Sequence, residues 1–154
     1  QYLLDNDIKE KGEFQLTNAL ENMKAKGLKF ETGKVQEWLD CGNKNSTVYT
    51  NSRVLHHMAE AGKTMVDATA TINNSTIIQP SLIGKNVVIT NAVVGPYATI
   101  GDNCVIEKSI VENCIIQNNT KVKHAVINNA MLGSYVVFEG EQKDLSIGDY
   151  TTAI

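Results

Sequence analysis

The C-terminal half of the chain repeats with a spacing that neither an α-helix nor a single β-strand has. Four rows open with an aliphatic residue and return to a large apolar residue six positions later; they begin at Ile83, Ile100, Ile116 and Leu132. A third apolar position follows eleven residues after each of the first three row starts, at Val94, Val111 and Ile127. An earlier row fits the same offsets with Val66, Ile72 and Ile77. A helix would need apolar residues three and four apart, and a strand would need them two apart.

A spacing of five to six residues fits a chain that bends three times per turn. Each short extended segment then points one aliphatic side chain inward, and successive turns stack like residues on like. The repeat therefore predicts a mainly β fold, a parallel β-helix of about five coils within residues 63–154. Aromatic residues form only 6% of the chain, in keeping with an interior of Ile, Val and Leu. A β-sandwich of short strands is the alternative, but sandwiches do not keep a six-then-five spacing over four rows.

The stretch from Val66 to Phe138 resembles the hexapeptide-repeat family, most clearly in the thirteen residues from Val94 to Ile106. That resemblance implies a left-handed winding, which the spacing alone does not dictate. Residues 139–143 are polar and predict a loop. The segment 145–150 is expected to form a last short strand or cap over the open end of the coils.

Residues 1–62 differ in kind and predict a small α/β segment. Apolar residues four and three apart, at Leu16, Leu20 and Met23, predict a helix that begins near Gln15 or Thr17 and stops before Gly27. Residues 28–32 and 33–39 alternate well enough for a short hairpin. Residues 44–61 predict a second helix that Gly62 ends. Its candidate buried positions are Val48, Val54, Leu55 and Met58.

Two motifs in this segment resemble the closing part of a known catalytic domain. Residues 12–20, Gly-Glu-Phe-Gln-Leu-Thr-Asn-Ala-Leu, and residues 37–43, Glu-Trp-Leu-Asp-Cys-Gly-Asn, are similar to stretches of sugar-1-phosphate nucleotidylyltransferases. The glucose-1-phosphate thymidylyltransferase-like enzymes are the nearest group. In that family a nucleotide-binding α/β domain precedes a hexapeptide β-helix, so both motifs and the repeat occur here in the family's order. The resemblance implies transfer of a nucleotidyl group from a nucleoside triphosphate to a sugar 1-phosphate, with Mg²⁺ and release of pyrophosphate.

The resemblance also implies roles for three residues. Asp40 corresponds to a carboxylate that helps to hold the Mg²⁺, a task suited to a hard oxygen ligand; the alternative is an Asp that caps the turn into Gly42. Glu13 would lie near the sugar side of the pocket, or would favour the N-terminus of the following helix as a carboxylate. Trp38 either packs beside a strand or lines the pocket. Asn18 stands where the family commonly has Asp, which puts any charge-dependent role there in doubt.

The family's Gly-rich nucleotide loop, its Glu-Lys-Pro sugar motif and its first metal-binding Asp have no counterpart in the sequence. In-line attack on a phosphorus needs backbone donors and cationic clamps around the phosphates. We therefore expect a C-terminal fragment, in keeping with a chain that starts at Gln1 rather than Met. We expect it to be inactive alone and to serve assembly of a homo-oligomer through its β-helix.

Two other functions fit a hexapeptide β-helix. Many such proteins are acyltransferases that use a His as general base. His124 lies within the coils and would serve that role here; otherwise it is an ordinary solvent-facing residue. The other possibility is a purely structural oligomerisation domain. His56 and His57 belong to the second predicted helix and are expected to face solvent or a subunit.

Composition narrows the partners and the compartment. The net charge is −3 and the cationic residues are scattered, so nothing indicates a nucleic-acid partner. We expect no membrane partner either, because the sequence has neither an apolar run of about 18 residues nor the start of a signal peptide. The three cysteines, Cys41, Cys104 and Cys114, show no metal-binding spacing. They predict reduced thiols in a cytoplasmic protein.

Overall fold

The computed structural model describes residues 1–141, and they form two compact units. The first is Gln1–Trp38, and the second is the chain from Leu39 onward. The expected division between residues 62 and 63 concerns the domains of a parent enzyme and stays a prediction. The expected cap at residues 145–150 and the end of the expected loop lie outside the described residues.

The first unit holds two helices, α1 (Tyr2–Asp5) and α2 (Leu16–Ala25), which contact each other. The predicted helix is confirmed as α2, and it stops before Gly27, whose φ is +83°. The predicted hairpin is wrong, because residues 28–39 contain no strand. Alternation marks a possible buried face, but a strand also needs a partner and a surface to cover. Every side chain from Leu28 to Trp38 is exposed.

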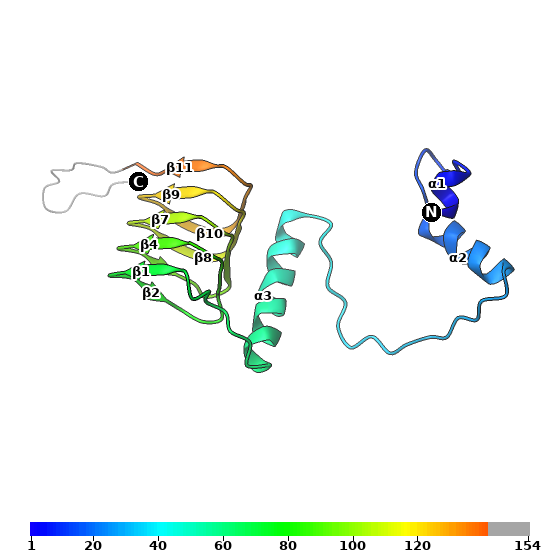
Figure 1. Ribbon diagram of the computed structural model, residues 1–154, viewed down its shortest axis with the longest axis horizontal. Coiled ribbons are helices and arrows are strands. Elements are labelled where there is room, and N and C mark those ends of the chain that lie inside the picture. Colours follow the sequence, from blue (N-terminus) through cyan, green and yellow to red (C-terminus); the bar gives the residue numbers. More distant parts are fainter. Residues whose placement is uncertain (142–154) are drawn as a thin grey trace, which may run out of the picture. The chain divides into compact units, whose positions relative to one another are not determined.

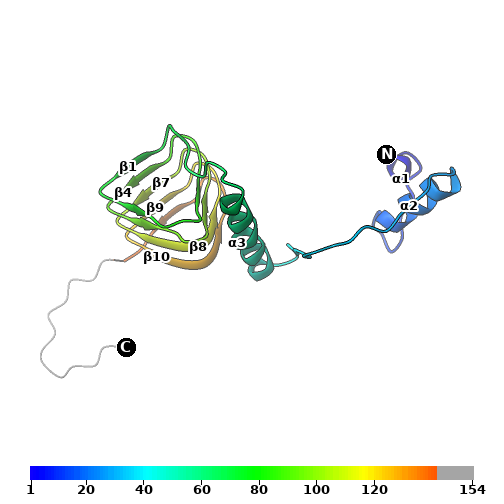
Figure 2. The same ribbon diagram turned by 90° about the horizontal axis from the view of Figure 1, so that it is seen from below.

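The second unit is a stack of short parallel strands, which confirms the predicted mainly β, parallel β-helix class (Figure 1). Viewed from below in Figure 2, the coils superpose in a roughly triangular outline. The first face is the sheet β1-β4-β7-β9-β11. The other sheet has the order β2-β5-β8-β6-β3, with β10 paired to β8, and forms two faces. The second face consists of β2, β5 and the first residues of β8 and β10, and the third face consists of β3, β6 and the last residues of β8 and β10. The strands are β1 (Thr71–Asn73), β2 (Thr76–Ile77), β3 (Leu82–Ile83), β4 (Val88–Thr90), β5 (Val93–Val94), β6 (Ala98–Ile100), β7 (Val105–Glu107), β8 (Ile110–Ile116), β9 (Lys121–Lys123), β10 (Val126–Leu132) and β11 (Val137–Glu139).

The predicted aliphatic columns fill the interior. The middle coils bury them to 1% exposure or less, at Ile83, Ile89, Val94, Ile100, Ile106, Val111, Ile116 and Val122. The two end coils are less covered, since Ile72 is 38% exposed and Phe138 is 45% exposed. Each coil of a solenoid packs against a neighbour on both sides, so a terminal coil lacks these contacts on one side.

The coils shorten from 17 to 16 residues because one corner has one residue fewer and the two strand segments on either side of it become one long strand. In the first full coil, three residues (95–97) separate strand β5 on the second face from strand β6 on the third face. In the next coil only two residues, Glu112 and Asn113, separate the paired parts of the two faces, and strand β8 runs continuously across both. β10 follows β8 in register. The change of period in the sequence therefore marks where this corner becomes one residue shorter, while Asn113 and Asn129 keep a positive φ there.

A helix covers the outer side of β8 and β10. Helix α3 (Lys44–Glu60) runs along the stack of coils (Figure 1) and contacts both strands. It begins with a capping box between Asn43 and Ser46. Val48 and Leu55, seven residues apart, are each 1% exposed, as predicted. Val54 was predicted to be buried but is 43% exposed, because it lies on the outer side of the helix.

The described helices include none that is both long and apolar enough to cross a membrane.

Candidate functional site at the His124 corner

Residues with positive φ stack at the corners of the coils. The corner between the first and second faces consists of Asn74, Asn91, Lys108 and His124, with φ between +44° and +51°. Hydrogen bonds between coils hold the column: the Lys108 amide donates to Thr90 O at 3.0 Å, and the His124 amide donates to Glu107 O at 3.1 Å. Asn tolerates this backbone region best after Gly. Lys108 and His124 thus occupy positions where the two lower coils have Asn.

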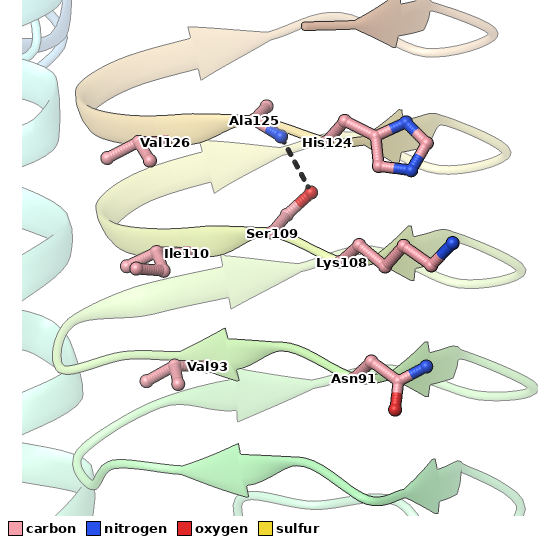
Figure 3. A pocket seen from close by; sticks show the side chains of 8 residues that line it. All are labelled: Asn91, Val93, Lys108, Ser109, Ile110, His124, Ala125 and Val126. Carbon is pink, nitrogen blue, oxygen red and sulfur yellow. Dashed lines mark hydrogen bonds between the residues drawn. The ribbon is translucent and has the colours of Figure 1, made fainter. Parts of the chain in front are cut away.

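A groove of about 430 Å³ lies beside this column (Figure 3). Polar side chains from Asn91, Lys108 and His124 stand on one side of the groove. The opposite side is aliphatic and consists of Val93, Ile110 and Val126, which are stacked in register. Between the two sides, the Ala125 amide donates to Ser109 Oγ at 3.1 Å. The groove can accept a ligand that has both a polar and an apolar part.

His124 is held by a carboxylate and has one nitrogen without a partner. Its Nδ1 lies 3.4 Å from Glu139 Oε1. A carboxylate at Nδ1 favours the tautomer with the proton on that nitrogen, which leaves Nε2 as an acceptor. Nε2 is buried and has no hydrogen-bond partner within residues 1–141. The side chain is 19% exposed, and its role as a general base stays a prediction.

Alternating charges flank the corner on the first face. Glu107, Lys123 and Glu139 are stacked in register on successive coils. Lys123 Nζ lies 3.1 Å from Glu107 Oε2. The hydrogen bond and charge of Lys123, helped by Lys108 and His124, hold the pKa of Glu107 below its ordinary value. The corner therefore keeps an ionised carboxylate beside His124 and Lys108.

Asp40 lies at the start of the second unit, in the turn before α3. Its Oδ1 accepts the amide of Gly42 at 3.2 Å, which is the turn-capping alternative considered above. The carboxylate is exposed. Within residues 1–141 no group of three or more His, Cys, Asp or Glu side chains could hold a metal ion. The described residues thus offer one candidate carboxylate and do not by themselves build a Mg²⁺ site.

Glu13 and Trp38 belong to the first unit, whereas Asp40 belongs to the second. Glu13 is exposed, and its backbone pairs with Glu10 through hydrogen bonds of 2.9 and 3.1 Å. Helix α2 begins at Leu16 without a side-chain cap on its N-terminus. Trp38 is 83% exposed. Substrate binding by Glu13 and Trp38 stays a prediction.

Sequence reasoning missed Lys108 and Asn91 as neighbours of His124. The signal was present, because these residues precede His124 by 16 and 33 positions, the lengths of one and two coils. The inward aliphatic residues that define the repeat do not reveal it, because the groove is built from the corner and the outward positions.

Comparisons with known proteins test the resemblance. The chain is 28% identical over 119 residues to glucose-1-phosphate thymidylyltransferase from Streptomyces antibioticus, which covers 69% of this chain and 33% of that protein. It is 29% identical over 157 aligned positions to the bifunctional protein GlmU from Alkaliphilus metalliredigens, which covers 90% of this chain and 33% of that protein. The predicted resemblance is confirmed. The chain spans about a third of the length of these curated relatives.

Two further comparisons add little to the function. No family model matches the chain. The crystal structure of serine acetyltransferase isoform 3 from Entamoeba histolytica, in complex with cysteine, matches 69% of this chain and 51% of that chain. The TM-score is 0.43 and the identity is 16%, a level from which nothing about this chain follows.

Proposed function

We propose that this chain is the C-terminal part of a nucleotidyltransferase that makes nucleotide-sugars from a nucleoside triphosphate and a sugar 1-phosphate. The similarity to a glucose-1-phosphate thymidylyltransferase over 69% of the chain carries this proposal. The order of the sequence supports it, since both family motifs precede the β-helix. In this proposal the chain alone is inactive, and the β-helix assembles the cytoplasmic parent enzyme into a homo-oligomer.

In the parent enzyme, bound Mg²⁺ would neutralise phosphate charge during the transfer. Asp40 is the residue of this chain that would contribute to holding it. A single carboxylate can serve where phosphate oxygens and waters complete the coordination. The other protein ligands would then come from outside residues 1–141.

The test is a pyrophosphate-release assay on the purified 154-residue chain with dTTP, glucose 1-phosphate and Mg²⁺. We expect no release above the rate without protein. Measurable release would overturn the proposal that the chain alone is inactive. Sedimentation of the same sample tests the assembly role, for which we expect a mass larger than one chain; a monomer at micromolar concentration would contradict it.

The geometry of His124 favours a second candidate, acyl transfer in the groove. A general base needs an available acceptor atom and a group that orients it. Glu139 would orient the imidazole, and Nε2 has no other partner in the described chain. The base would take the proton of an acceptor hydroxyl or amine as its oxygen or nitrogen bonds to the thioester carbonyl carbon; the carbon–sulfur bond would then break, and the proton would pass to the released thiolate of the carrier.

An acetyl-CoA titration separates the two candidates. Acyl transfer predicts binding that weakens in His124→Ala and is unchanged in His57→Ala, a His on the exposed side of α3. Assembly alone predicts no binding to either variant or to the unchanged chain.

A further inference from the structure

The turn that contains Asp40 is folded back against the start of α3. The Thr50 hydroxyl donates to the backbone oxygen of Asp40 at 2.7 Å. Thr47 Oγ1 lies 3.2 Å from the backbone oxygen of Cys41. The Gly42 amide closes the turn on the Asp40 carboxylate. The position of Asp40 therefore depends on the position of α3.

Helix α3 in turn is fixed to the β-helix at its N-terminal end. Lys44 Nζ donates to Asn129 O at 2.7 Å, and Asn129 Nδ2 donates to Asn45 Oδ1 at 3.3 Å. Asn129 is a corner residue of the third face with φ +51°. These contacts join the first turn of α3 to the uppermost long strand, β10.

A second set of contacts holds the middle of α3. The Thr99 hydroxyl donates to Asn51 Oδ1 at 2.6 Å, and Asn51 Nδ2 donates to Tyr97 O at 3.3 Å. The side-chain amide of Asn51 thus accepts one hydrogen bond through its oxygen and donates another through its nitrogen, both with residues of the same coil. Val48 and Leu55 are buried on either side of it. Two polar anchors and a buried apolar pair leave the helix little freedom to slide or rotate.

We propose that the β-helix positions the Asp40 turn, with Thr99 and Asn129 acting through α3 and Thr50. The inference rests on the proposed function in one respect, which is that Asp40 serves the site of the parent enzyme. The contacts themselves involve only residues of the second unit. A misplacement of about 1 Å at a reacting group can cost about 100-fold in rate. The solenoid would then set the geometry of a residue at its edge, in addition to any role in assembly.

The experiment is backbone ¹⁵N relaxation on the full 154-residue chain and its variants. Thr99→Val removes the hydroxyl that anchors Asn51, and Thr50→Val removes the hydroxyl that holds Asp40; both keep the side-chain shape. Thr90→Val is the matched control, since Thr90 is an equally half-buried strand residue on the first face, away from α3. We expect order parameters at residues 40–43 to fall from about 0.85 toward 0.6 in Thr99→Val and Thr50→Val. Thr90→Val should leave them unchanged.

The double variant, Thr99→Val with Thr50→Val, tests whether the two contacts act one through the other. If Thr99 acts through Thr50, the double variant should show the same loss of order at residues 40–43 as Thr50→Val alone. Lys44→Met should also loosen this turn, and Lys44→Arg should restore it.

Three results would overturn the inference. They are an unchanged turn in Thr99→Val, additive losses in the double variant, or an equal loss of order in the strands, which would mean general destabilisation. The proposal that the chain alone is inactive fails separately: pyrophosphate release by the isolated chain would refute it while leaving the coupling intact, whereas an unchanged turn would refute only the coupling.

Discussion

At the scale of single residues, positive φ at the corners is the feature that shapes the coils. Asn fills most of these positions, but the His124 corner also holds a Lys, and the other two corners hold Tyr135 and Tyr97. A residue with a Cβ pays about 1–2 kcal/mol to adopt this conformation. Such strain persists only where the surroundings enforce it, and it gathers at functional sites. Lys108 and His124 adopt this strained conformation beside the groove.

Gly95 is the corner residue that tolerates substitution least. Its φ is +100°, and a Cβ there would lie 2.0 Å from the backbone oxygen of Ile78 on the coil below. Gly95→Ala should lower the free energy of unfolding by more than about 2 kcal/mol, since a backbone clash adds to the strain. The measurement is the urea midpoint by circular dichroism. Gly33→Ala is the control, because its Cβ would meet nothing within 4 Å. Equal midpoints for the two variants would contradict the expectation.

The ion pair between Lys123 and Glu107 makes a prediction about pH. Because the folded pKa of Glu107 is lowered, the pair stabilises the fold above the unfolded pKa and loses this contribution as the pH falls through the folded pKa. Lys123→Met should raise the pKa of Glu107 toward its ordinary value, as measured by NMR titration of the Glu side-chain carboxyl. Lys121→Met, on the same strand, should change it less. An unchanged pKa in Lys123→Met would show that another group holds Glu107 ionised.

At the scale of elements, α3 belongs structurally to the solenoid. Its buried side consists of Val48 and Leu55, and its polar anchors reach strands β6 and β10. A helix of this polarity gains most of its stability from packing on another surface. We therefore expect α3 and the coils to unfold together.

Leu55→Ala tests this cooperative unit. Removing a buried Leu side chain should cost about 2–5 kcal/mol. It should lower the midpoints measured for helix and strand signals by the same amount. Val54→Ala, next along the chain but 43% exposed, should change stability by no more than about 0.5 kcal/mol. Separate transitions for helix and strands in Leu55→Ala would show that α3 is an independent element.

The sequence predicted α2, α3 and the coils because each buries a periodic set of side chains. The spacing of Ile83, Ile100 and Ile116 is enough to predict a coil, whichever residues stand on its outer surface. The hairpin at residues 28–39 failed because alternation describes one surface of a strand and says nothing about its partner. The anchors of α3 were beyond sequence reasoning for a related reason. They join residues such as Asn51 and Thr99, which are 48 positions apart, through polar contacts that leave no periodic trace.

At the scale of the whole molecule, the two units differ in how well they cover their apolar residues. The first unit leaves large apolar side chains exposed, among them Leu16 at 72%, Val35 at 70% and Trp38 at 83%. Chains shorter than about 40 residues rarely bury enough surface to fold alone. In the proposed parent enzyme these side chains would pack against the rest of the catalytic domain.

Limited proteolysis should separate the two units at the segment between them. Residues 28–38 are exposed and contain no helix or strand, so trypsin should cut first after Lys29 and Lys34. Cleavage in the native state follows the population of open conformations, and the stacked coils should open rarely. We expect a product that begins near residue 35 to persist while the first unit is degraded, as measured by mass spectrometry over time. A protease specific for Glu should cut first after Glu31 and leave a product of similar extent. First cuts after Lys85 or Lys121, within the coils, would mean that the solenoid is the less stable part of the chain.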